Sequence, residues 1–388
     1  MKNNTQKSFL VFFFLFYLLM AIGSFLQIMY FTKTHYLSNF GFFYGAMAIS
    51  GAIIQIYFIR IQYLAPKTIL NMGLIIYGTS MLLRIFSNSL LISIMSGILG
   101  GVGATLVIVL MRIEILNRAE EINIDGGNRL IGTRYLIIQS TSLIGTILSG
   151  ILLVNFLKTI DFLTISIISV GVLMIMLAFW PKHINAKLES SKKFEVLPKD
   201  PLLIKIFLNA LLIGLLVAMI EPLIPAIFLI NHISVGNTTI LTIFTTLLGL
   251  LGGTIFRKKI IANNAVNFLA GIGLFIGTVF IFSYFSNIIL LIGIFAFSIM
   301  SPGYFQLKEI FEFRLIQHSK ITKAELVAYS QTAYLIGDSI GAPIMTHIIY
   351  IKNGLVAWEL YGIVSLLFAF SVWYFWIKNN SVKFPKTE

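Results

Sequence analysis

Long apolar stretches, separated by short polar segments, follow one another along almost the whole chain. Each is about as long as the roughly 20 apolar residues that a helix needs to cross the hydrocarbon core of a bilayer. The alternation of apolar and polar residues that is typical of transmembrane β-strands is not seen. The pattern predicts an all-α polytopic membrane protein with twelve transmembrane helices. These are predicted at Ser8–Phe31, Phe40–Tyr63, Thr68–Phe86, Leu90–Arg112, Leu130–Phe156, Phe162–Trp180, Leu203–Ile230, Thr238–Phe256, Ala265–Phe285, Ile288–Phe311, Leu326–Ile349 and Leu355–Ile377.

The composition agrees with this class and excludes several others. Hydrophobic residues make up 58% of the chain and charged residues 11%, whereas a soluble domain carries about 25% charged residues. The absence of cysteine excludes disulfides and Cys-ligated metals. We find no hydrolase, zinc-protease or phosphate-loop motif, so we expect neither an enzyme nor a metal or cofactor site.

The positive charges are distributed very unevenly between the two sides of the membrane. Of the 28 Lys and Arg residues, 23 fall on the side of the N-terminus if the spans alternate. Only Lys33, Lys158 and Lys352 fall on the other side, while Arg84 and Arg134 lie within spans. Because loops rich in Lys and Arg stay in the cytoplasm, both termini are predicted to be cytoplasmic. The net charge of +13 is thereby explained by orientation and anionic lipid, and no nucleic-acid partner is expected.

The chain divides into two halves that resemble each other. The polar segment "PKHINAKLESSKKFEVLPKDPL" (Pro181–Leu202) separates the sixth and seventh spans. It predicts an N-terminal bundle at 1–181, a cytoplasmic central loop at 182–202 and a C-terminal bundle at 203–388. In addition, "QSTSLIGTILSG" (Gln139–Gly150) recurs as "QTAYLIGDSIGA" (Gln331–Ala342), which indicates an internal parallel repeat.

With these features the chain resembles the major facilitator superfamily of secondary transporters, although the short motifs of that family are degenerate here. Gly145, Ser149 and Gly150 approximate the Gly-x-x-x-Gly-Pro motif of antiporters in the fifth span, without its proline. The resemblance implies two six-helix bundles that rock around a central cavity. It also implies that the first, fifth, tenth and eleventh spans line the cavity. The substrate-cavity candidates are Gln27, Tyr30, Arg134, Gln139, Gln306, Gln331 and Tyr334.

Asp338 lies near the middle of the eleventh span. A charged side chain at that depth costs roughly 2.5–3.5 kcal/mol on insertion scales, so its presence requires a reason. Loss of hydration favours the neutral acid, which makes Asp338 a candidate for proton coupling. The alternative is a protonated aspartate that only joins neighbouring helices.

Glu221 is the second candidate for proton coupling. Pro222 and Pro225 follow it and remove backbone hydrogen bonds from the seventh span. A broken helix at membrane depth often lines a cavity. The alternative is a kink from which the glutamate reaches the outer surface.

Other charged residues have simpler explanations. Arg134 could bind an anion or pair with a carboxylate, but at the inner end of its span we expect it to extend to the lipid headgroups. Arg84 and Glu359 lie close to outer span ends, where a charge is tolerated. Lys308 and Glu309, at the inner end of the tenth span, are expected on a solvated helix end rather than in a gate.

These features together predict a secondary active transporter that works by alternating access. We expect an antiporter that couples protons, or another ion, to efflux of a small amphipathic compound or metabolite. The alternatives are an uptake carrier or lipid translocator of the same fold, and a channel, which the two-half repeat disfavours. The chain is expected to be a monomer in the lipid of a bacterial cell membrane.

The predicted topology can be tested with single cysteines, because the chain contains none. Cysteines that replace Lys192 and Lys258 should react with an impermeant maleimide only from the cytoplasm. A cysteine at position 158 should react only from outside. Labelling of positions 158 and 192 from the same side would contradict the twelve-span topology.

Overall fold

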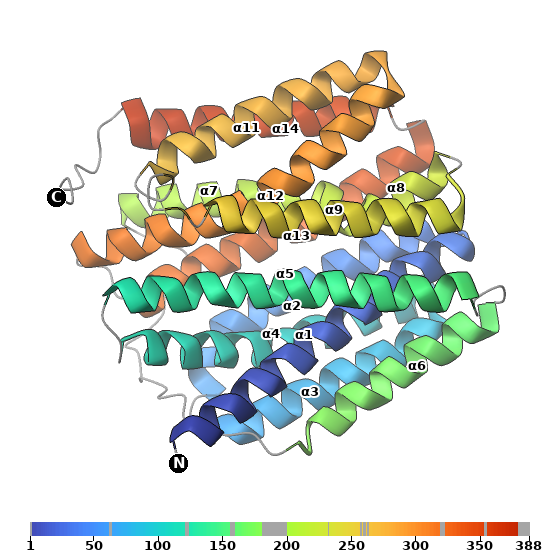
Figure 1. The fold of residues 1–388 in the computed structure, drawn as a ribbon, viewed down its shortest axis with the longest axis horizontal. Coiled ribbons are helices and arrows are strands. Elements are labelled where there is room, and N and C mark those ends of the chain that lie inside the picture. Colours follow the sequence, from blue (N-terminus) through green and yellow to red (C-terminus); the bar gives the residue numbers. More distant parts are fainter. Residues whose placement is uncertain are drawn as a thin grey trace.

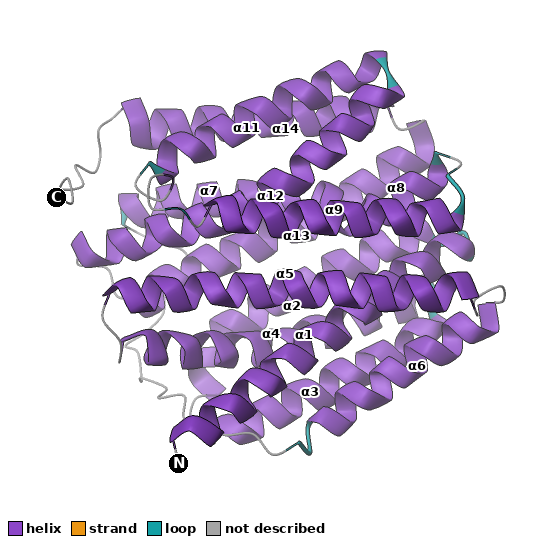
Figure 2. Ribbon diagram, in the orientation of Figure 1, coloured by secondary structure: helices purple, strands orange, loops and turns teal. Residues whose placement is uncertain are grey.

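The computed structural model describes residues 2–378 except 62–63, 121–123, 156–159, 181–199, 232, 257, 259–260, 262–263, 319–322 and 353–354. Every regular element in this part of the chain is a helix (Figure 2). The α-helices are α1 (Lys2–Lys33), α2 (Leu37–Ile61), α3 (Pro66–Leu83), α4 (Leu90–Glu120), α5 (Ile124–Asn155), α6 (Ile160–Leu177), α7 (Pro201–Ile220), α8 (Ile224–Ile230), α9 (Val235–Phe256), α11 (Ala265–Phe282), α12 (Asn287–His318), α13 (Lys323–Lys352) and α14 (Leu355–Val372). Short single-turn elements extend four of them, namely η1 (Arg84–Phe86), η2 (Glu221–Leu223), η3 (Ser283–Phe285) and η4 (Trp373–Lys378).

Ten helices among the described residues are long and apolar enough to cross a membrane. The prediction of an all-α polytopic protein is therefore confirmed. Helices α5 and α13, which correspond to the predicted fifth and eleventh spans, do not meet the same criterion; only 136–152 of α5 qualifies as a shorter apolar helix. For α13 the physical reason is its polar content, since it carries the segment that begins at Gln331 and contains Asp338.

The predicted break in the seventh span is present. Helix α7 ends at Ile220, the single turn η2 begins at Glu221, and α8 continues to Ile230. Pro222 and Pro225 lack the N–H groups that would continue the helical ladder, so the backbone changes direction here. The break places Glu221 at a point where the helix no longer satisfies all of its own carbonyl groups.

The helices form two packed sets (Figure 1). In the N-terminal set, α1–α6, α4 packs against α2 and α3, and α1 packs against α5 and α6. In the C-terminal set, α7–α14, α13 packs against α7, α14 against α11, and α12 against α9 and α11. The main contacts between the sets are α2 with α13 and α5 with α9. Helix α1 begins and η4 ends on the same side of the molecule (left in Figure 1), called the inner end below.

Glycines allow α13 to lie very close to its neighbours. A Cβ at Gly337 would collide with the Leu211 carbonyl of α7, and one at Gly214 would collide with the Tyr334 carbonyl of α13. On the other face of α13, a Cβ at Gly45 of α2 would lie 2.8 Å from both Pro343 and the Ser339 carbonyl. Small residues at such crossings let backbones approach and gain van der Waals contact. Helix α13 is thus held firmly to α7 while also touching the N-terminal set.

This packing predicts that Gly337→Ala destabilises the protein. The added methyl group meets backbone rather than a flexible side chain, and overpacking of this kind typically costs about 1–3 kcal/mol. The melting temperature of the purified protein should fall. Gly271→Ala is the matched control, because nothing lies within 4 Å of a Cβ there, and it should leave the melting temperature unchanged or slightly higher. Equal melting temperatures for both variants would contradict the close approach of α13 to α7.

Candidate functional site

A cavity of about 390 Å³ lies between the two sets of helices. Its lining comes from α1, α2, α3, η1 and α5 on one side and from η2, α8, α9 and α12 on the other. The volume falls within the range of about 300–1,000 Å³ that is usual for small-molecule sites. A cavity with walls from both sets changes shape when the sets move relative to each other, which suits a binding site in a moving protein.

Glu221 lines this cavity at the break between α7 and α8. Its side chain is exposed to the cavity, and its neighbours Pro222, Ile224 and Pro225 also form part of the wall. A carboxyl group on a broken helix is well placed to exchange a proton or to bind a cation, because water in the cavity can reach it.

Hydroxyl groups cover the wall that α9 forms. Thr242 donates a hydrogen bond to the Thr238 carbonyl, and Thr245 and Thr246 both donate to the Thr242 carbonyl, each at 2.8 Å. Because these hydrogens are used within α9, the oxygens face a ligand mainly as acceptors. Gln139 of α5 lies against this wall, since a Cβ at Gly249 would be 3.3 Å from its Oε1 atom. The wall is therefore polar without being charged.

Arg84 forms a cationic part of the lining. It belongs to η1, and only 2% of its surface is exposed. Its Nη1 atom donates to Gln27 Oε1 at 2.7 Å, and its guanidinium lies 4.8 Å from the centre of the Phe43 ring and 5.6 Å from that of Tyr77. All four residues line the cavity.

Asp338 lies just beyond the cavity wall, where α13 meets α2 and α7. The side chain is 6% exposed, and its Oδ1 atom has no hydrogen-bond partner. Tyr44 of α2, which does line the cavity, and Glu221 both act electrostatically on the Asp338 carboxyl. The carboxyl group thus belongs to the C-terminal set, while Tyr44, which acts on it, belongs to the N-terminal set.

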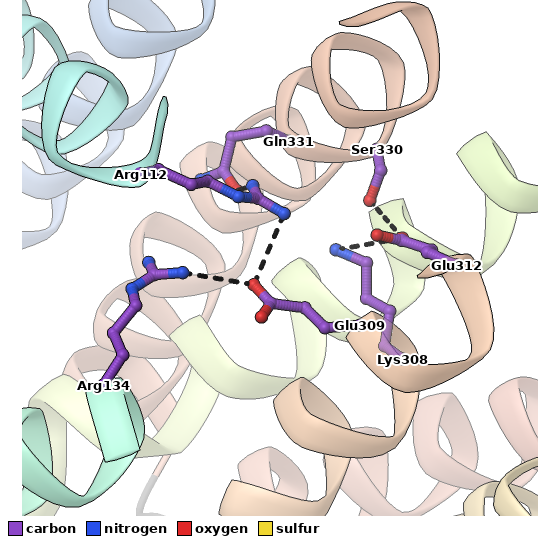
Figure 3. A network of polar contacts seen from close by, with 7 residues as sticks. All are labelled: Arg112, Arg134, Lys308, Glu309, Glu312, Ser330 and Gln331. Atoms are coloured by element: carbon purple, nitrogen blue, oxygen red, sulfur yellow. Dashed lines mark hydrogen bonds and ion pairs between the residues drawn. The ribbon is translucent and has the colours of Figure 1, made fainter. Parts of the chain in front are cut away.

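Charged residues join the two sets on the inner side of the cavity (Figure 3). Glu309 of α12 pairs with Arg112 of α4 at 3.3 Å and with Arg134 of α5 at 3.6 Å. Arg112 also donates to Gln331 Oε1 of α13 at 3.1 Å. These contacts hold the inner ends of the sets together. At the opposite end the sets also touch, because Gly150 of α5 meets Thr239 of α9.

A second group of polar contacts lies beside this network but stays within the C-terminal set. Lys308 pairs with Glu312 at 3.7 Å, one turn along α12, and Ser330 of α13 donates to Glu312. Lys308 also lies 5.6 Å from the centre of the Tyr334 ring. These residues stabilise the crossing of α12 and α13 and do not bridge the two sets.

The sequence has no match among family models or curated proteins. Solved structures, however, are similar over nearly the whole chain. A D-xylose–proton symporter is 13% identical with a TM-score of 0.70, covering 96% of this chain and 98% of its own. The nucleoside transporter NupG (12% identical, TM-score 0.67, 95% and 99% covered) and the human organic anion transporter MFSD10 (12%, 0.63, 94% and 99%) are also similar. The chain has the major facilitator fold.

Within this fold, three of the predicted site residues line the cavity, namely Gln27, Gln139 and Glu221. The others lie elsewhere. Tyr30 donates to the Ile85 carbonyl at 2.7 Å and so joins α1 to η1. Gln306 is buried beside Gly253, with its Nε2 atom unpartnered. Arg134 and Gln331 belong to the inner network, Tyr334 packs against Phe305, and Asp338 lies behind Tyr44.

Three expectations about charged residues differ from what the structure shows. Arg84 was expected at a tolerant span end, but it is buried and lines the cavity. Arg134 was expected to extend to the headgroups, and Glu309 to lie on a solvated helix end, but they pair with each other. The sequence does contain one relevant signal, since Arg84 lies within an apolar span, but its depth depends on how α1, α2 and α3 pack.

The inner network predicts a measurable effect of Glu309→Gln. This change removes the carboxylate that both Arg112 and Arg134 contact, and a partly exposed ion pair is worth up to about 1 kcal/mol. The inner end should open about fivefold more often. A cysteine at Ser142, in the cavity wall, should then react about fivefold faster with an impermeant maleimide added to inside-out vesicles.

Glu312→Gln is the matched control, because Glu312 contacts Lys308 and Ser330 within the C-terminal set. It should leave the labelling rate at position 142 unchanged. Equal acceleration by the two variants would show that the contacts of Glu309 with the arginines do not hold the inner end closed.

Proposed function

We propose that this protein is a secondary active transporter that works by alternating access and expels a small amphipathic compound or metabolite in exchange for protons. The observation that carries the proposal is the cavity between the two sets of helices, with Glu221 in its wall and Asp338 at the contact between the sets. Support comes also from the solved structures of the same fold, which are named as transporters of D-xylose with protons, of nucleosides and of organic anions.

The proposed moving parts are the two predicted bundles, 1–181 and 203–388. In this proposal twelve helices cross the cell membrane, both termini and the central loop at 182–202 are cytoplasmic, and the protein works as a monomer. The packing supports it, since most contacts stay within each set while the contacts between the sets are fewer and concentrated at α2–α13 and α5–α9. The cytoplasmic side then corresponds to the inner end.

The proposed coupling site is Asp338 together with Glu221 and Tyr44. Two carboxyl groups that act on each other resist simultaneous ionisation, so one proton in the pair is favoured. Tyr44 lines the cavity and acts on the Asp338 carboxyl, so we propose that a proton arrives from the cavity past Tyr44. Because Tyr44 and Asp338 belong to different sets, movement of the sets changes the surroundings of the carboxyl. Protonation and conformation are thereby linked.

Efflux is proposed because the glycines that resemble the antiporter motif lie at close helix contacts, one of which crosses the two sets. Gly145 of α5 approaches Ala21 of α1, and Gly150 approaches Thr239 of α9 in the other set. The second candidate is proton-coupled uptake, which the similarity to a D-xylose–proton symporter favours. Both candidates use the same cavity and the same carboxyl groups, and they differ only in the direction of net flux.

Asp338→Asn should uncouple transport from the proton gradient. Asparagine imitates the protonated acid permanently, so the pair can no longer exchange its proton. In proteoliposomes, gradient-driven transport of a substrate found by counterflow screening should fall to the background level. Counterflow exchange without a gradient should persist, because the cavity wall is unchanged.

Ser339→Ala is the matched control, since Ser339 bonds only the Ile336 carbonyl of its own helix. It should transport normally with and without the gradient. Melting temperatures of both variants show whether they are folded. Normal gradient-driven transport by folded Asp338→Asn would show that the aspartate only joins helices.

A further inference from the structure

Arg84 has no role in the coupling described above, yet it is the most deeply buried charged residue of the cavity wall. Its exposed fraction is 2%. An arginine side chain stays protonated in proteins, so burial does not remove its charge. An isolated buried charge is expensive unless it is paired and hydrogen-bonded. The neighbours of Arg84 therefore decide whether the protein itself supplies all the hydrogen-bond acceptors and the negative charge that the guanidinium needs.

Those neighbours satisfy the guanidinium only in part. Gln27 accepts one hydrogen bond, and the Phe43 and Tyr77 rings contribute cation–π attraction. The Nε atom, however, is buried without a hydrogen-bond partner. Within the described chain, no carboxylate pairs with Arg84, and neither Glu221 nor Asp338 is among the groups whose charge acts on it. The positive charge is thus oriented and partly desolvated but not neutralised.

The position of Arg84 suggests what neutralises it. Gln27, Phe43 and Tyr77 line the cavity together with Arg84, so a ligand in the cavity reaches this group. The guanidinium presents a planar fork of donors that matches a carboxylate or a phosphate bidentately. The rings of Phe25, Phe40 and Phe43 line the same cavity and offer apolar area next to the charge.

We propose that Arg84, Gln27 and the rings beside them form a binding subsite for the acidic group of an amphipathic organic anion. The inference rests on the proposed function, because it takes the cavity as the substrate site. It adds the substrate class: a carboxylate, phosphonate or similar group attached to an apolar or aromatic body. Glu221 lies in the same cavity but does not form an ion pair with Arg84 among the described contacts. The anionic end of the substrate therefore binds at η1 and not at the α7–α8 break.

The competing explanation is that Arg84 only joins helices. Its role would then be structural, through its contacts with α1, α2 and α3. An acidic ligand would bind no more tightly than a neutral one. The two explanations differ in ligand preference, which can be measured with compounds that differ in a single group.

The test measures ligand-induced thermal stabilisation of the purified protein with matched pairs: benzoate and benzamide, 3-phenylpropionate and its amide, and phenylphosphonate and its neutral diamide. We expect the acids to raise the melting temperature more than their partners. Charge-assisted hydrogen bonds are worth enough that Arg84→Gln should weaken acid binding about tenfold or more. Arg84→Lys should retain part of the preference for the acid, because it keeps the charge but not the fork.

Lys33→Gln is the matched control for charge. It removes one positive charge from the end of α1, in a residue that does not line the cavity, and it should keep the full preference for acids. The inference is overturned if no acid stabilises the protein more than its partner, or if folded Arg84→Gln retains the wild-type preference.

A second measurement leaves Arg84 in place and so does not depend on the folding of its variants. Ser24 lines the cavity and is exposed to it. In Ser24→Cys, the acid of a pair should slow alkylation of the thiol by N-ethylmaleimide more than the amide does. Equal protection by acid and amide would overturn the subsite.

These binding assays need no proton gradient. They can therefore fail or succeed independently of the transport assay that tests the proposed function. Acid-selective binding without gradient-driven transport would leave the subsite standing and contradict proton-coupled transport. If the gradient drove transport of amides and acids equally well, proton-coupled transport would be supported and the anionic subsite would be overturned.

Discussion

The interior of a bilayer offers no water, so every polar group that the chain places there must be paired, neutral or in contact with a cavity. The structure satisfies this constraint in three ways. Glu309 is paired with Arg112 and Arg134 at the inner end. Many Thr and Ser hydroxyls donate to backbone carbonyls, as Thr242 does within its own helix and Ser365 does to α11. Glu221 and Arg84 line the cavity between the sets of helices. The helices are thus packed so that these charged groups within the membrane are paired or line the cavity.

The same constraint makes the contact between the two sets sensitive to charge. Close glycine packing fixes α13 to α7, so the two helices move together. Across the sets, glycine packing also occurs, as between Gly45 and α13, but it is joined by electrostatic contacts: arginines with Glu309, and Tyr44 with the Asp338 carboxyl. Electrostatic contacts of this type change by a few kcal/mol or less when a proton or an anionic ligand arrives, which is enough to shift a balanced equilibrium between two conformations. A rigid unit and an adjustable interface are what alternating access requires.

Much of the fold was predictable from the sequence because apolar length alone identifies membrane-spanning helices. The break at Glu221 was also predictable, since two prolines act on the local backbone. The site was predictable only in part. Gln27 and Tyr30 lie one helical turn apart on α1, yet one lines the cavity and the other bonds Ile85. Arg84 lies near the end of its span but is enclosed by Phe43 and Tyr77. Which face of a helix meets which neighbour depends on the packing of distant segments, and no local pattern specifies it.

The central claim is that the two sets of helices open alternately at the two ends of the cavity. Electron–electron double resonance between spin labels tests it most directly. One pair of labels is placed at the inner end, at positions 67 and 258, and the other at the outer end, at positions 88 and 237; all four side chains are exposed. A change of pH or addition of a transported ligand should shorten the distance between labels at one end while lengthening it at the other. Distances that stay fixed, or that change in the same direction at both ends while transport proceeds, would contradict the account.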